Sequence, residues 1–104
     1  MKLKIILLLM VAFHINTVFG QNTFKAVIKD SETKEPLIGA TAILSGTATG
    51  ATADIDGLIT LTSIPDGKQI IEFRYIGYET RKDTFKFPLT TSNLIEIFLK
   101  SNVD

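Results

Sequence analysis

Between residues 23 and 100, the chain is a series of short runs rich in Ile, Val, Thr, Phe and Tyr, in which apolar and polar residues alternate. An alternation with a period of two places successive side chains on opposite faces of a strand, so that one face can be buried while the other meets water. No segment of this region keeps the i, i+3, i+4, i+7 apolar spacing of an amphipathic helix over three turns. The pattern predicts an all-β fold.

The runs are separated by turn residues such as Pro65-Asp66-Gly67. We expect strands at residues 23–29, 38–45, 58–64, 68–76, 79–87 and 93–100. Their predicted inward residues are Phe24, Ala26, Ile28, Ala40, Ala42, Leu44, Ile59, Leu61, Ile71, Phe73, Tyr75, Phe85, Phe87, Ile95, Ile97 and Leu99. Residues 79–87 are polar until their last few positions, as is typical of an edge strand. Six to seven short strands at this spacing predict a seven-stranded antiparallel β-sandwich.

Residues 46–57, GTATGATADIDG, are the one stretch that suggests a ligand site. A phosphate-binding loop would need Gly-Lys-Ser/Thr at its end and a helix after it, and the sequence supplies neither. Asp54 and Asp56 are weak candidates for a calcium site, since Leu58 and Thr60 stand where further oxygen ligands would follow. We therefore expect no metal site, and a turn in which Asp56-Gly57 closes a hairpin.

The first twenty residues are typical of a secretory signal peptide. Lys2 and Lys4 precede a largely apolar run of eleven residues, IILLLMVAFHI, which is shorter than the roughly 20 residues needed to cross a bilayer. Val18 and Gly20 are small residues at the positions that favour cleavage before Gln21. We expect a signal peptide at 1–20 and one domain at 21–104, with no transmembrane segment in the mature chain.

The composition of residues 21–104 excludes several classes of function. Nine Lys and Arg against eleven Asp and Glu leave a net charge of −2, so a basic surface for nucleic acid is not expected. This region has no His, Cys, Met or Trp, and it therefore lacks disulfides, soft metal ligands and the commonest general base. We expect a protein that is not an enzyme, with no catalytic residues and no cofactor.

The sequence YIGYE at 75–79 offers the best candidate for an interaction surface. Alternation places Tyr75 toward the core, which leaves Tyr78 as the aromatic ring that can be exposed, beside Glu79 and Arg81. Such a ring next to a sheet edge suits a glycan or a peptide. The other interpretation, which the residues leave open, is that Tyr78 packs at a corner of the sandwich.

Taken together, several short motifs resemble the carboxypeptidase-regulatory-like domain, a peptidase-associated, transthyretin-like β-sandwich. These are Glu35-Pro36-Leu37, Gly39-Ala40, Gly46-Thr47, Gly50, Asp54-Ile55-Asp56-Gly57, Ile64-Pro65-Asp66-Gly67 and Tyr75-Ile76-Gly77-Tyr78-Glu79. Domains of this family commonly follow the signal peptide of TonB-dependent outer-membrane receptors that import glycans, or stand beside carboxypeptidase domains. The resemblance implies a non-catalytic accessory or interaction module whose partner is an envelope protein, in the periplasm or at the outer membrane.

Two departures from the family pattern are visible. No TonB box, plug or barrel follows residue 100, which suggests a module standing alone. Lys34 stands where the family turn usually has Gly, and at a positive φ it would cost about 1 kcal/mol. Two alternative functions remain open, namely a glycan- or peptide-binding module and an inactive remnant of a longer receptor.

Overall fold

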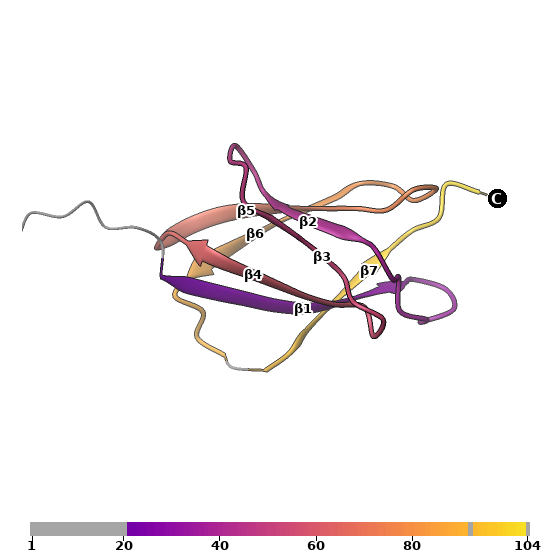
Figure 1. The fold of residues 1–104 in the computed structure, drawn as a ribbon, viewed down its shortest axis with the longest axis horizontal. Helices are drawn as coiled ribbons and strands as arrows, with labels where there is room; N and C mark the ends of the chain where they lie inside the picture. The colour runs from indigo at the N-terminus through magenta and orange to yellow at the C-terminus, as the bar shows by residue number, and fades with distance from the viewer. Residues whose placement is uncertain (1–20, 92, 104) are drawn as a thin grey trace, which may run out of the picture.

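The computed structural model describes residues 21–91 and 93–103, which form two β-sheets packed face to face (Figure 1). The predicted signal peptide at 1–20 lies outside the described residues. Within the described residues, no helix is long and apolar enough to cross a membrane. The all-β prediction is confirmed.

Seven strands make up the two sheets. In chain order they are β1 (Asn22–Asp30), β2 (Thr41–Leu44), β3 (Gly50–Thr52), β4 (Leu58–Ile64), β5 (Gly67–Arg74), β6 (Arg81–Phe87) and β7 (Ile95–Leu99). One sheet has three strands in the order β4-β1-β7, and the other has four in the order β3-β2-β5-β6. The edge position predicted for residues 79–87 is confirmed by β6.

The strands pair antiparallel in every case but one, because β7 runs parallel to β1. The register of this parallel pair places Ile28 beside Ile97. The exception follows from the connection between β6 and β7, which crosses from the four-stranded sheet to the three-stranded sheet (Figure 1). Since the crossing takes place at the end where β1 begins, β7 starts there and runs in the same direction as β1.

The core lies between the sheets and centres on Phe24, which is fully buried. Its ring centroid lies 6.1 Å from that of Phe73, 4.8 Å from that of Phe85 and 6.4 Å from that of Phe87. Most of the predicted inward residues are buried, while Tyr75, Phe85 and Ile95 are half-buried and pack against the core. Ala40 and Ala42 are fully buried, as expected for positions where the sheets approach closely.

The sequence did not indicate β3, which lies inside the stretch 46–57. This strand has three residues with small side chains, and its central Ala51 pairs with Ala42 of β2. The predicted hairpin at Asp56-Gly57 is wrong, because β3 and β4 belong to different sheets. The turn is a corner that carries the chain from one sheet to the other.

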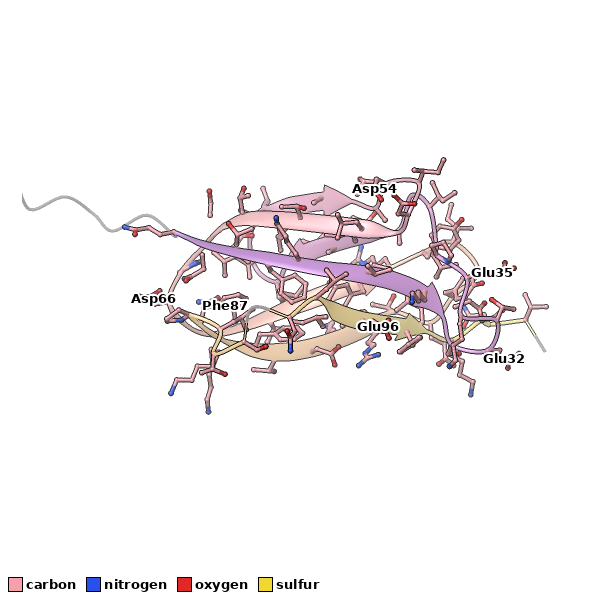
Figure 2. The ribbon with its side chains drawn as sticks, turned by 90° about the horizontal axis from the view of Figure 1, so that it is seen from below. Glu32, Glu35, Asp54, Asp66, Phe87 and Glu96 are labelled. Atoms are coloured by element: carbon pink, nitrogen blue, oxygen red, sulfur yellow. The ribbon has the colours of Figure 1, made fainter. Side chains whose placement is uncertain are left out.

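Five segments meet at one end of the sandwich, at the right in Figure 1. They are residues 31–36 and 37–40 between β1 and β2, 53–57 after β3, 75–80 after β5, and 100–103 after β7. Figure 2 shows Glu32, Glu35 and Asp54 at this end, with Asp66 and Phe87 at the other. We call these five segments the loop end.

Candidate functional site at the loop end

The loop end is held together by backbone hydrogen bonds between segments that are distant in sequence. The amide of Gly39 donates to the carbonyl of Ala53 at 3.0 Å, and the amide of Asn102 donates to the carbonyl of Gly77 at 2.8 Å. The amide of Glu79 donates to the carbonyl of Lys100 at 2.8 Å. The loops are therefore linked to one another as well as to the strands that carry them.

Tyr78, the central residue of the predicted interaction surface, is half-buried at this end. Its ring packs edge-on against that of Tyr75, with 5.4 Å between the centroids. Its hydroxyl donates a hydrogen bond to Oδ2 of Asp30, at the end of β1. This is the corner packing that the sequence left open, and it links the 75–80 segment to the three-stranded sheet.

Asp30 is a largely buried carboxylate, with 9% of its surface exposed. Its Oδ1 accepts hydrogen bonds from the amides of Glu32 at 2.7 Å and Thr33 at 3.0 Å. The hydrogen bond from Tyr78 and those from the two amides hold the pKa of Asp30 below its ordinary value of 3.8. The same hydrogen bond, together with burial, raises the pKa of Tyr78 to about 12.

The pairing of Asp30 with Tyr78 was missed by sequence reasoning, although a signal for it exists. Asp30 follows Phe24, Ala26 and Ile28 at a spacing of two, so it occupies the inward face of β1. A carboxylate at an inward position needs hydrogen-bond donors. A hydroxyl-bearing residue near the same end of the sandwich was the partner to look for.

Glu79 and Arg81, the other two predicted surface residues, differ in their surroundings. Glu79 is exposed. Nη1 of Arg81 donates to the carbonyl oxygen of Phe98 in β7 at 3.0 Å, and its Nε lies 2.8 Å from Oδ2 of Asp83. The guanidinium of Arg81 therefore links the edges of the two sheets.

Asp54 organises the corner between β3 and β4. Its Oδ1 accepts hydrogen bonds from the amides of Asp56 and Leu58, both at 2.9 Å. Asp56 is exposed. Within the part of the chain that the structure describes, no three His, Cys, Asp or Glu side chains come together as a metal site would require.

A hollow of about 590 Å³ opens at the loop end between the 37–40 and 75–80 segments. It is lined by Gly39, Thr41, Arg74, Tyr75, Ile76 and Thr80. Ile76 is 96% exposed at its rim. The hollow therefore combines an aromatic ring, an aliphatic side chain and hydroxyls in one place.

Large apolar side chains stand exposed on several segments of the loop end. They are Ile38, Ile55, Ile76 and Val103. The hydrogen bond from Gly39 to Ala53 brings the segments of Ile38 and Ile55 together, and that from Asn102 to Gly77 does the same for Ile76 and Val103. Single exposed apolar residues are ordinary, but a group of them on linked loops is typical of a contact surface.

A model of the carboxypeptidase-regulatory-like domain family matches residues 24–103, nearly the whole of the two sheets. The chain belongs to this family. The resemblance noted in the sequence is therefore confirmed, and Asp54-Ile55-Asp56-Gly57, one of its motifs, forms the corner between the sheets of the carboxypeptidase-regulatory-like fold.

Relatives of this carboxypeptidase-regulatory-like domain include TonB-dependent receptors. The chain is 30% identical to a TonB-dependent receptor of Formosa agariphila over 95% of its own length. It is 35% identical to the TonB-dependent receptor SusC of Bacteroides thetaiotaomicron over 78% of its length. The chain spans only 9% and 8% of these two receptors.

Among solved structures, a chain of a type II cohesin–X-dockerin complex from Acetivibrio cellulolyticus has a similar fold. The TM-score is 0.60 at 19% identity, and the match covers 75% of this chain and 56% of that one. Another structure of this complex, which carries a different interface mutation, matches with a TM-score of 0.56 at 17% identity, over 77% of this chain and 58% of that one. At this level of identity the likeness shows the β-sandwich fold alone.

Proposed function

We propose that this carboxypeptidase-regulatory-like domain is a non-catalytic interaction module of the bacterial cell envelope that contacts a partner protein through its loop end. The observation that carries the proposal is the set of exposed apolar side chains on two pairs of hydrogen-bonded loops. Ile38 and Ile55 stand on the 37–40 and 53–57 segments, and Ile76 and Val103 on the 75–80 and 100–103 segments. An apolar group on a rigid frame binds at a lower cost in conformational entropy than one on loose loops.

The chemistry of the loop end supports binding rather than catalysis. Its polar groups serve the fold, since Asp30 and Tyr78 bond to each other and Asp54 holds a turn. No His or Cys occurs between residues 21 and 104 to act as a base or nucleophile. The relatedness to TonB-dependent receptors supports an envelope setting after export.

The partner class follows from the charges around the apolar group. Glu32, Glu35, Asp54, Asp56 and Glu79 are all exposed on these loops. The nearby cations are partly engaged: Nζ of Lys34 donates to the carbonyl of Ser31 and lies 4.5 Å from the centre of the Phe98 ring. A partner surface with apolar side chains flanked by Lys or Arg complements this end best.

Site-specific photo-crosslinking in cells of the native host tests the proposal. A photoreactive residue replaces Ile76 at the loop end or, as the matched control, the exposed Thr62 of β4. We expect discrete crosslinked products with an envelope protein from position 76 and none from position 62. Equal products from both positions, or products with cytoplasmic proteins only, would contradict it.

Sugar binding through Tyr78 is the second candidate, favoured by the hollow beside Tyr75. Because the Tyr78 ring packs edge-on against Tyr75, a sugar would stack on the part of the Tyr78 ring that is still exposed. A glycan array read with the wild type and with Tyr78→Ala checks this candidate. Glycan binding that disappears in the variant, while circular dichroism stays native, is the expected result if it holds.

A further inference from the structure

The outer face of the four-stranded sheet carries a stripe of positive charge along β5 and β6. Lys68, Lys82 and Lys86 are exposed there, with Ile70 and Thr84 between them. The register places Lys68 directly opposite Lys86, and Ile70 opposite Thr84. We call these five residues the basic face.

Two lysines directly opposite each other in a sheet repel, which lowers the stability of the fold. Glu72, on the same face, stands opposite Lys82 rather than beside Lys68 and Lys86. Its Oε1 accepts from Arg74 Nη2 at 2.9 Å and from Arg74 Nε at 3.1 Å, so Glu72 does not relieve the repulsion between Lys68 and Lys86. Among the described residues, no carboxylate forms an ion pair with Lys68, Lys82 or Lys86. The charges of Lys68 and Lys86 are thus available to a ligand outside the fold.

Lysines on an edge strand often serve only to prevent aggregation. That role accounts for Lys82 and Lys86 on β6, which is the edge of its sheet. It does not account for Lys68, because β5 lies between β2 and β6 and has no free edge. A binding role explains all three lysines, including the repulsion between Lys68 and Lys86.

We propose that the basic face and the free edge of β6 bind an extended acidic peptide segment, which adds to the sheet as a further strand. An added strand places every second side chain on the outer face, at intervals of about 7 Å, beside Lys82, Thr84 and Lys86. Carboxylates at those alternate positions meet the lysines, and Ile70, which is 44% exposed, offers an apolar contact.

The stripe runs along the edge of the sheet, and this favours a peptide over a membrane or a polysaccharide. A peptide can use both the lysines and the edge of β6, because its backbone offers the regular row of donors and acceptors that pairs with a strand, and the other two ligands have no such row. The basic face shares no residue with the loop end, so this proposal stands or fails independently of the proposed function.

The test uses the whole domain and a seven-residue peptide, as long as β6, that alternates Glu with Val. A matched peptide carries Gln in place of each Glu. The protein variants are Lys68→Gln with Lys86→Gln and, as a control with the same change of net charge, Lys25→Gln with Lys29→Gln on β1 of the other sheet. Titrations followed by NMR give Kd, and amide hydrogen exchange reports on β6.

We expect the Glu peptide to bind, and the Lys68/Lys86 double variant to weaken that binding roughly fivefold, while the control pair changes it less than twofold. Slower exchange of β6 amides on binding would show strand addition. The double variant should itself fold at least as stably as the wild type, because a repulsion has been removed.

Several outcomes would overturn the proposal. These are equal binding of the Gln peptide, binding without slower exchange in β6, or no binding at all. Vesicles containing phosphatidylglycerol that bind the basic face more tightly than the Glu peptide would point to a membrane surface and would also reject it.

Discussion

Gly57 offers the sharpest test of how the corner between the sheets is built. Its φ is +80°, and a Cβ built on it would lie 2.8 Å from the carbonyl oxygen of Ile28 and 2.9 Å from Cβ of Pro36. Its own carbonyl accepts a hydrogen bond from the amide of Ile28 at 2.8 Å. A methyl group at this position therefore meets the backbone of β1 and a proline ring, neither of which moves easily.

Gly46 is the matched control, because its φ is +79° and nothing lies within 4 Å of the Cβ position. Replacing either glycine with Ala costs about 1 kcal/mol for the left-handed backbone. Only at Gly57 does the steric conflict add to this, by roughly 1–3 kcal/mol. We expect Gly46→Ala to lower the free energy of unfolding by about 1 kcal/mol and Gly57→Ala by about 3 kcal/mol.

Urea denaturation of residues 21–104, followed by circular dichroism, measures both losses. For a domain of this size a loss of about 3 kcal/mol is a large part of the roughly 4–12 kcal/mol that is typical. The two midpoints should therefore be well separated at equal m-values. Equal losses for the two variants would refute the reasoning, since they would mean that the corner relaxes and the close approach to Ile28 and Pro36 carries no cost.

Three further predictions concern the loop end and the core. Tyr78→Phe should destabilise the fold at neutral pH and return the pKa of Asp30 toward 3.8, which NMR titration of the carboxyl measures. In the wild type, the Asp30 contribution to stability is present above about pH 4 and is lost as the pH falls through the lowered pKa of Asp30. The Tyr78 contribution is full below pH 10 and is lost as the pH rises through about 12. Urea midpoints measured against pH should show both losses in the wild type, and the Tyr78→Phe variant should lack the alkaline loss. Lys34→Gly relieves a φ of +64° but removes the contact with Phe98, so thermal denaturation should show a change within about 0.5 kcal/mol. Phe24→Ala should lower the free energy of unfolding by about 3–5 kcal/mol, more than any other substitution named here. A smaller loss than that of Gly57→Ala would mean that the aromatic cluster is not the centre of the core.

The sequence predicted the strands and their buried faces well, because alternation is a local signal that each strand carries by itself. Phe24, Ala26 and Ile28 follow it without exception, and all three are fully buried. The family resemblance indicated a positive φ at Lys34, where the turn usually has Gly, and its φ of +64° confirms this. These features depend on neighbouring residues only.

What the sequence did not predict depends on contacts between distant residues. The strand β3 is too short to show alternation. It forms because its backbone pairs with β2, where Ala51 lies opposite Ala42. The hairpin expected at Asp56-Gly57 fails for the same reason, since an Asp-Gly turn fits both a hairpin and a corner. Only the pairing of β4 with β1 decides between them.

The pair of Asp30 and Tyr78 joins the fold of this domain to its proposed function. Asp30 ends β1 in one sheet, while Tyr78 lies in the segment that leaves the other sheet and carries Ile76. The hydrogen bond between them fixes the position of that segment relative to the rest of the loop end. A module that binds through exposed apolar residues needs them held in place before the partner arrives, because ordering them on binding would weaken the complex. The hydrogen-bonded pair of Asp30 and Tyr78 is therefore part of the frame that holds the exposed apolar side chains of the loop end.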